Sequence, residues 1–365
     1  MSSKKIQNLQ GLRGIAVLLV VFFHMLLIER KYAQFDNILP NSFMIGVSGV
    51  DLFFLISGFV MVAVTRDVFQ SQLKIWRFLY HRVTRIYPLY WFYSIIILCV
   101  FIVHPSWVNS NQNNQVNILE SFLLIPQNLL PLVNVGWTLI HEIYFYIVFT
   151  ALLFFPKNSL LYGLISWAIL IFIGNIYMPW ENNPFIKVYF NPLTIEFIVG
   201  CLIAILYFKK SIKGNAKIIT LTSLTIWVIG YYLYKKIIGE FIPSGWIRVL
   251  VFGVPCALGL YAALLYEKNE GSIMPKWICK VGDYSYSIYL SHILVLSVIG
   301  RFWSLFALEG YWDNLFMLLI MITFVVITGY ISSRFIEKVM LDKSRAIEQR
   351  FLSKIQFRSY ELKSG

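Results

Sequence analysis

The stretch that decides the fold class is LRGIAVLLVVFFHMLLI, residues 12–28, where apolar side chains run for nearly the length of a membrane crossing. A helix needs about 20 mostly apolar residues to cross a hydrocarbon core about 30 Å thick. The stretch is too long for the apolar part of a signal peptide, and no Ala-x-Ala cleavage pattern accompanies it. It therefore predicts a first membrane helix.

Similar apolar blocks recur along the whole chain. Hydrophobic residues make up 58% of the 365 residues and charged residues only 13%, whereas a soluble domain carries about 25% charged residues. Because lipid cannot hydrogen-bond to backbone groups, each block is predicted to be a helix. The sequence thus predicts an all-α polytopic membrane protein with about ten transmembrane helices. The predicted spans are 12–29, 46–64, 86–104, 136–155, 159–178, 192–208, 218–234, 247–266, 284–302 and 312–333.

The distribution of basic residues predicts the orientation. If the N-terminus is cytoplasmic, 24 of the 31 Lys and Arg residues fall on the cytoplasmic side, as the positive-inside rule requires. Both termini are therefore predicted to be cytoplasmic, in a bacterial inner (plasma) membrane. The net charge of +13 is interpreted as a set of topology signals facing anionic lipid, with no nucleic acid as partner.

One transmembrane domain is expected over residues 1–333, followed by a basic cytoplasmic tail over 334–365 that lies along the inner leaflet. No additional soluble domain is expected. The longest connection, 104–135, holds no Lys or Arg and is predicted to lie outside, with a short helix over 119–124. Four scattered cysteines predict free thiols, and the histidine spacing predicts no metal site.

Ionisable residues inside the spans are the informative positions, because they are costly in lipid and usually face a cavity or a partner. Arg13 and His24 are eleven residues apart, which brings them within about 20° of one helix face and separates them by about 16 Å. This pattern predicts a cation near the cytoplasm and an imidazole deeper in the bilayer. The alternative is that Arg13 extends to the interface and His24 only packs.

Arg82 and Arg85 form a second cluster, where the cytoplasmic loop meets the third span. Their i, i+3 spacing lets both guanidinium groups project from one face of a helix start. Paired guanidiniums suit bidentate contacts to phosphate oxygens. A topological anchor would have the same sequence, so this position alone leaves both interpretations open.

A third group lies at the outer end of the fourth span, where Trp137, His141 and Glu142 are followed by Tyr146. A carboxylate that enters the membrane among aromatic residues must be paired or neutral, and it could orient a histidine, bind a hydroxyl or be structural. Three further intramembrane groups are less specific, namely Asp51, Glu196 and His292. For His292, a lone histidine, the pattern favours a packing role over a functional one.

In order along the chain, these motifs resemble the acyltransferase family 3 membrane proteins. The resemblance covers nearly the whole sequence. It rests on five segments: residues 9–16 (LQGLRGIA) with His24, residues 49–59 (GVDLFFLISGF), residues 82–88 (RVTRIYP), residues 137–146 (WTLIHEIYFY) and residues 286–292 (YSIYLSH). Each motif is weak singly, but the ordered set is specific.

The resemblance implies about ten helices and transfer of acetyl or other short acyl groups to lipopolysaccharide, exopolysaccharide or other surface glycans. It implies that His24 is the catalytic imidazole and that Arg13, Arg82 and Arg85 lie on the donor side. His141 stands where the family usually has a small apolar residue, so its role is open. Many relatives carry a C-terminal esterase-like domain; without one, this chain is expected to be the stand-alone, exopolysaccharide-acetylating kind.

The resulting hypothesis is a general-base mechanism, in which His24 removes the hydroxyl proton as the sugar attacks the thioester of acetyl-CoA. A covalent acyl-histidine intermediate is the open variant. Acetyl-CoA, or another acyl-CoA, is expected as the donor substrate, with no permanently bound cofactor. Glu142 is the second catalytic candidate. Candidate acceptor-binding or pore residues are Asp51, Trp137, His141, Tyr146 and His292.

Two other classes of function remain open at this level. A secondary transporter would also bury charges at midplane, but it would show two related halves with broken helices, and the sequence shows no such symmetry. A non-catalytic subunit of polysaccharide assembly would not depend on His24. The identity of the saccharide and the oligomeric state are left open.

Overall fold

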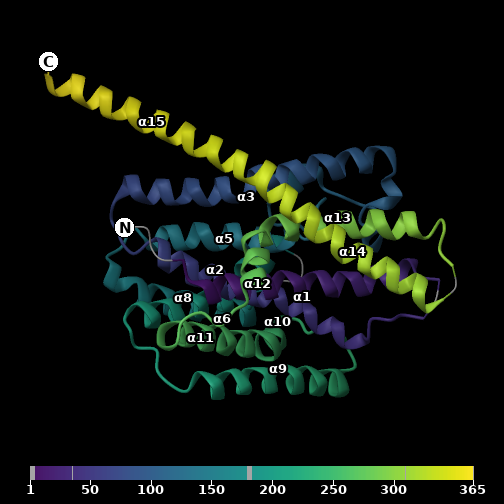
Figure 1. The fold of residues 1–365 in the computed structure, drawn as a ribbon. Helices are drawn as coiled ribbons and strands as arrows, with labels where there is room; N and C mark the ends of the chain where they lie inside the picture. Colours follow the sequence, from purple (N-terminus) through teal and green to yellow (C-terminus); the bar gives the residue numbers. More distant parts are fainter. Residues whose placement is uncertain (1–4, 35, 179–182, 309, 365) are drawn as a thin grey trace.

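A computed structural model describes residues 5–34, 36–178, 183–308 and 310–364. These residues form helices and no strand (Figure 1). Nine helices in this part of the chain are long and apolar enough to cross a membrane, and Gly136–Leu152 is a shorter apolar helix. The predicted all-α polytopic membrane protein is therefore confirmed.

Every predicted span corresponds to a helix. The ten are α1 (Gln7–Tyr32), α2 (Gly49–Val64), α3 (Gln72–Val103), α5 (Gly136–Leu152), α6 (Leu160–Tyr177), α8 (Thr194–Phe208), α9 (Ala216–Ile238), α11 (Val254–Asn269), α13 (Ser285–Trp303) and α14 (Tyr311–Ser332). Four short helices join them, namely α4 (Ile118–Leu123), α7 (Pro184–Tyr189), α10 (Gly245–Arg248) and α12 (Lys276–Asp283), and a long helix α15 (Lys338–Ser364) follows.

The largest difference from the predicted boundaries concerns α3. This helix begins at Gln72 rather than near residue 86, because the polar segment before the apolar block continues the same helix. Arg82 and Arg85 therefore lie within a continuous helix and not in its first turn. The short helix predicted over 119–124 is present as α4, where the backbone carbonyl of Ser121 accepts a hydrogen bond from the Tyr90 hydroxyl at 2.7 Å.

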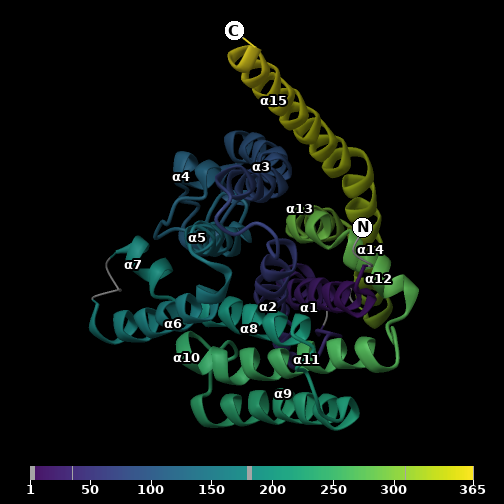
Figure 2. The same ribbon diagram turned by 90° about the vertical axis from the view of Figure 1, so that its left-hand side faces the viewer.

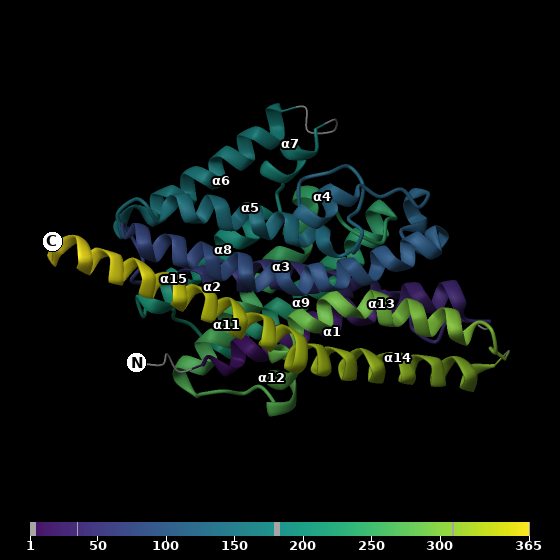
Figure 3. The same cartoon turned by 90° about the horizontal axis from the view of Figure 1, so that it is seen from above.

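Figure 2 shows α3, α5 and α13 nearly end-on and α9 and α11 more along their length, with α1 and α2 between α3 on one side and α9 on the other. α1 begins and α15 ends at the same end of the bundle (Figures 1 and 3). The outer helix α9 exposes apolar side chains such as Ile218, Leu221 and Ile237. In a protein of this class such a surface faces lipid hydrocarbon.

Glycines bring α12 directly against α1. A Cβ atom at Gly14 would lie 2.3 Å from the carbonyl oxygen of Ile278, and one at Gly282 would lie 1.9 Å from the carbonyl oxygen of Gln10. Small residues allow this backbone approach between membrane helices. Because α13 follows α12 almost directly, this packing brings the start of α13 beside Arg13.

A π-helical turn, Ser333–Glu337, joins α14 to α15. The turn is one residue wider than an α-helical turn, and it directs Glu337 into the protein, where it is buried. Beyond the turn α15 lies beside the first half of α3 and then extends past the bundle (Figures 1 and 2).

Candidate active site

A cavity of about 390 Å³ lies among α1, α2, α3, α5, α13 and α15. Its charged lining comes from distant parts of the chain, and four of these residues were predicted from the sequence as site residues. Among the described residues, the arginines and carboxylates that line the cavity are Arg13, Arg82, Arg85, Arg345 and Glu142. The tertiary fold thus brings the predicted donor-side arginines to one place.

More guanidinium groups than carboxylates line the cavity, so part of the positive charge is not neutralised by the lining. Arg85 forms an ion pair with Glu337 (3.1 Å), and Arg13 donates to the Ser285 hydroxyl at 3.0 Å. The Arg82 guanidinium lies 5.8 Å from the Phe78 ring, and its buried Nε has no hydrogen-bond partner within the described residues. A buried donor without a partner is costly. The cavity is therefore suited to an anionic ligand that accepts from guanidinium groups.

Glu142 faces this cavity and is held by two hydroxyl groups. Tyr146, one helical turn further along α5, donates its hydroxyl to Glu142 Oε1, and the Ser57 hydroxyl of α2 donates to the same oxygen at 3.1 Å. All three residues line the cavity. Ser57 was not singled out from the sequence, although it lies within the 49–59 motif.

His24 lies against His292 of α13, with 3.2 Å between His24 Nδ1 and His292 Nε2. His292 Nδ1 lies 2.7 Å from the carbonyl oxygen of Tyr289, and His24 Nδ1 lies 2.9 Å from that of Val20. Carbonyl oxygens only accept, so both Nδ1 atoms carry hydrogen, and neutral His292 accepts at Nε2. This pattern assigns His24 the tautomer whose Nε2 has a free lone pair.

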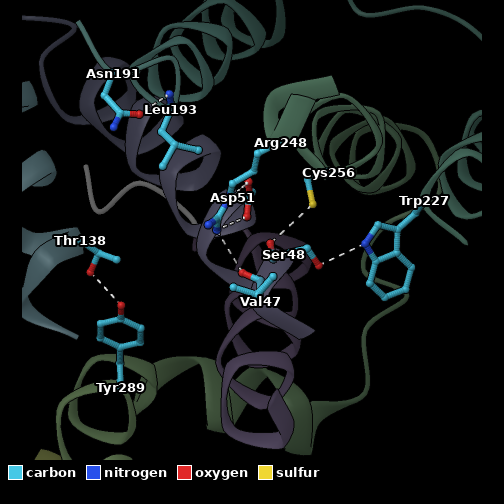
Figure 4. A network of polar contacts seen from close by, with 10 residues as sticks. All are labelled: Val47, Ser48, Asp51, Thr138, Asn191, Leu193, Trp227, Arg248, Cys256 and Tyr289. Atoms are coloured by element: carbon cyan, nitrogen blue, oxygen red, sulfur yellow. Dashed lines mark hydrogen bonds and ion pairs between the residues drawn. The ribbon is translucent and has the colours of Figure 1, made fainter. Parts of the chain in front are cut away.

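Tyr289 separates this histidine pair from the cavity. Its side chain lines the cavity, its ring lies 5.8 Å from the His292 ring, and its hydroxyl is 2.8 Å from the Thr138 hydroxyl of α5 (Figure 4). His24 is not among the cavity-lining residues. The arginines therefore line the cavity, whereas the two imidazoles lie outside its lining, next to Tyr289.

A second charged group is buried beside the cavity. Asp51 of α2 and Arg248 of α10 form a bidentate ion pair, with Nε–Oδ1 3.0 Å and Nη2–Oδ2 2.8 Å (Figure 4). The Arg248 guanidinium also lies 5.9 Å from the Trp137 ring. Arg248 was missed in the sequence, although an arginine inside an apolar block was a signal of the kind used for Arg13.

His141 belongs to this second group and not to the cavity. It is buried, and its ring lies edge-on to the Trp137 ring at 5.9 Å and 6.3 Å from the Phe54 ring. Glu196 is buried nearby, close enough to Gly253 that a Cβ there would lie 2.7 Å from Glu196 Oε1. The structure therefore does not bring Asp51, Trp137 and His141 together with Glu142 and Tyr146 in one site.

The family model of the acyltransferase 3 family, described as an acyltransferase domain, matches residues 6–334. The chain belongs to this family. The match covers α1 and α3, which carry Arg13, Arg82 and Arg85, and it covers the pair His24 and His292, but it ends before α15. The protein is therefore an acyltransferase.

Curated relatives of this acyltransferase agree with the match. It is 26% identical to the exopolysaccharide production protein ExoZ of Rhizobium meliloti over 274 residues, 72% of this chain and 80% of that protein. It is 24% identical to the peptidoglycan O-acetyltransferase OatA of Listeria monocytogenes, over 92% of this chain and 56% of that protein. A putative acetyltransferase of Acidianus two-tailed virus is 29% identical, with 79% and 83% covered. No solved structure matches the chain.

Proposed function

We propose that this protein transfers an acetyl or other short acyl group from cytoplasmic acyl-CoA to a hydroxyl of a cell-surface or lipid-linked saccharide in the bacterial inner membrane. The observation that carries the proposal is an arginine-lined cavity next to a paired imidazole inside a membrane bundle. The printed names of relatives, an exopolysaccharide production protein and O-acetyltransferases, support a polysaccharide acceptor.

The donor enters on the arginine side. Arg13, Arg82 and Arg85 come from two helices and face one cavity. Guanidinium groups match phosphate oxygens in charge and in bidentate geometry. The cavity volume of about 390 Å³ is in the range of ligand sites, so it holds part of the donor while the remainder extends outward. Arg13 begins the helical face that leads to His24, about 16 Å along α1.

His24 acts as the general base. Its Nε2 takes the proton of the sugar hydroxyl as the oxygen attacks the thioester carbonyl; the new C–O bond forms, the C–S bond breaks, and the proton passes to the departing thiolate. His292 accepts from His24 Nδ1–H throughout, which holds the ring in the reactive tautomer and stabilises the imidazolium. Glu142 orients the Ser57 and Tyr146 hydroxyls along the route.

The acceptor approaches from the opposite side of the membrane. For the thioester of a donor in the cavity to reach His24, the Tyr289 side chain moves away from Thr138. Membership of an acyltransferase family sets aside the transporter and the non-catalytic subunit as alternatives.

The test is acetylation of surface glycan in cells that carry His24→Ala, measured by NMR of the purified glycan. General-base catalysis contributes about 10²–10⁴-fold, so acetylation is expected to fall below detection at unchanged protein level. The matched control is His104→Ala. His104 stacks on Trp107 in the connection after α3 (ring centroids 4.4 Å apart) and belongs neither to the cavity lining nor to the histidine pair. Full acetylation in His24→Ala at equal protein level contradicts the assignment.

A further inference from the structure

α15 closes one side of the arginine-lined cavity. Leu341 and Arg345 of this helix are lining residues, and the backbone carbonyl of Ser344 accepts a hydrogen bond from the Tyr80 hydroxyl of α3 at 2.9 Å. These contacts lie on the same part of α3 that carries Arg82 and Arg85. The helix is thus part of the cavity wall and not a detached tail.

Glu348 fixes α15 in this position. Its carboxylate pairs with Arg77 Nε and with His81 Nε2, both at 2.7 Å, and its side chain is only 10% exposed. Leu341, Arg345 and Glu348 are spaced i, i+4 and i+7, so they share one face of the helix. The anchor therefore lies one turn beyond Arg345 and on the face that Arg345 presents to the cavity.

The Arg345 guanidinium is available for a ligand. Its side chain is 67% exposed, and its carboxylate neighbour, Asp342 on the same helix, is 3.6 Å away and 56% exposed. An exposed pair of this kind contributes little. Arg345 therefore adds a positive charge to a cavity that already holds Arg82 without a carboxylate partner in the described chain.

We propose that Arg345 is a further donor-binding residue, which contacts a phosphate of the acyl donor at the cavity mouth, and that Glu348 positions it by holding α15 on α3. The inference rests on the proposed function, since it assumes a phosphate-bearing thioester donor. The family match ends at residue 334, so this element lies beyond the matched domain and adds to the donor site from outside it.

The experiment compares two acetyl donors with the purified full-length protein in vesicles. Acetyl-CoA carries phosphates, whereas S-acetylpantetheine has the same thioester arm and none. A hydrogen bond to a charged group contributes about 1.5–3 kcal/mol, so Arg345→Gln is expected to lower kcat/KM for acetyl-CoA by roughly tenfold or more. With S-acetylpantetheine the variant is expected to equal the wild type. Lys343→Gln, the same charge change on the opposite face of α15, is the matched control and is expected to change neither donor.

Glu348→Gln gives a second variant. It removes the carboxylate charge from both ion pairs, so it is expected to weaken use of acetyl-CoA in the same selective way, through KM more than kcat. Wild-type kinetics for this variant would show that the anchor has no role in donor binding, and would overturn that part of the proposal.

Three results overturn the assignment of Arg345. An equal loss with both donors indicates a structural role, and an unchanged kcat/KM indicates no contact. A loss that appears only in vesicles with anionic lipid indicates that the residue binds lipid headgroups. Failure of the underlying function is distinguishable, because then the wild type and Lys343→Gln would transfer acetyl from neither donor.

Discussion

Two groups of charges lie inside this membrane protein, and they differ in how the charges are balanced. Around Asp51 and Arg248 the single guanidinium meets Asp51 in a bidentate pair, and the neighbouring Glu196 carboxylate and His141 Nδ1 are buried without a hydrogen-bond partner in the described chain. In the adjacent cavity four arginines meet one lining carboxylate, and Arg82 keeps a buried Nε without a partner in the described chain.

The difference separates structural from functional charge. A satisfied buried pair needs nothing further, and removing one partner leaves an uncompensated charge. An excess of donors around a cavity is stable only if water or a ligand completes it. Only the second group lines the cavity, and there guanidinium groups outnumber carboxylates. It is therefore the group expected to bind an anionic substrate, and substitutions in the two groups should change different quantities.

The largest expected effect is on stability, at the closed pair. Asp51→Ala leaves the Arg248 guanidinium buried without its carboxylate, and breaking such a pair costs about 3–5 kcal/mol. We expect a matching fall in the free energy of unfolding of the detergent-solubilised protein, or loss of folded protein. Replacing both partners, as Asp51→Leu with Arg248→Met, is expected to restore most of the stability. Asp342→Ala at an exposed position is the control; a stable Asp51→Ala would show that the pair is not structural.

The next effect is on turnover, at the histidine pair. In His292→Ala the imidazolium of His24 loses one of its two acceptors and keeps the Val20 carbonyl, and a hydrogen bond to a charged group is worth up to about 3 kcal/mol. We expect kcat to fall by about 10²-fold while KM for acetyl-CoA and the unfolding midpoint change little. If KM rises and stability falls together with the fall in kcat, His292 only packs.

A smaller effect is expected on donor binding, in the open cavity. Arg82→Gln is expected to raise KM for acetyl-CoA by roughly tenfold, because one charge-assisted hydrogen bond is lost, without lowering the unfolding midpoint. Arg85→Gln sharpens the contrast, since it also removes the ion-pair partner of buried Glu337. This variant should therefore raise KM and also lower the unfolding midpoint. Equal destabilisation in the two variants would contradict an open cavity.

The smallest effect is expected at the hydroxyl pair of Thr138 and Tyr289, between the cavity and the histidine pair. Thr138→Val removes the hydroxyl that pairs with Tyr289, at a cost of about 1 kcal/mol in the free energy of unfolding. Because Tyr289 moves during transfer in the proposed mechanism, kcat is not expected to fall. A large drop in kcat at unchanged stability would show that this hydroxyl pair takes part in the chemistry.

The sequence predicted the spans because each is a continuous apolar block with few helix interruptions. It also singled out Arg13 and Glu142, since an ionisable group within an apolar span stands out without any knowledge of its partner. Arg82 and Arg85 were singled out by their i, i+3 spacing at the start of the third span. The boundary of α3 was not predictable from the apolar pattern, because its first turns are polar and lie outside the apolar block.

The sequence could not show which of these side chains pair with one another. His24 and His292 are 268 positions apart, and Asp51 and Arg248 are 197 apart, so only packing determines which groups meet. Arg345 lies in a basic segment whose composition is typical of any cytoplasmic tail. Its place at the cavity depends on Glu348 meeting α3, a contact that no local pattern encodes.

The wide turn Ser333–Glu337 determines the direction in which the side chains of the following helix, α15, point. Each residue of an α-helix advances the side-chain direction by about 100°, so the extra residue in this turn sets which face of α15 meets α3. Deleting one residue there would leave the apolar helices α1 to α14 intact and rotate Arg345 and Glu348 together, away from Arg77 and His81. The width of this one turn thus determines whether the side chains of α15 reach the substrate site of the enzyme or point away from it.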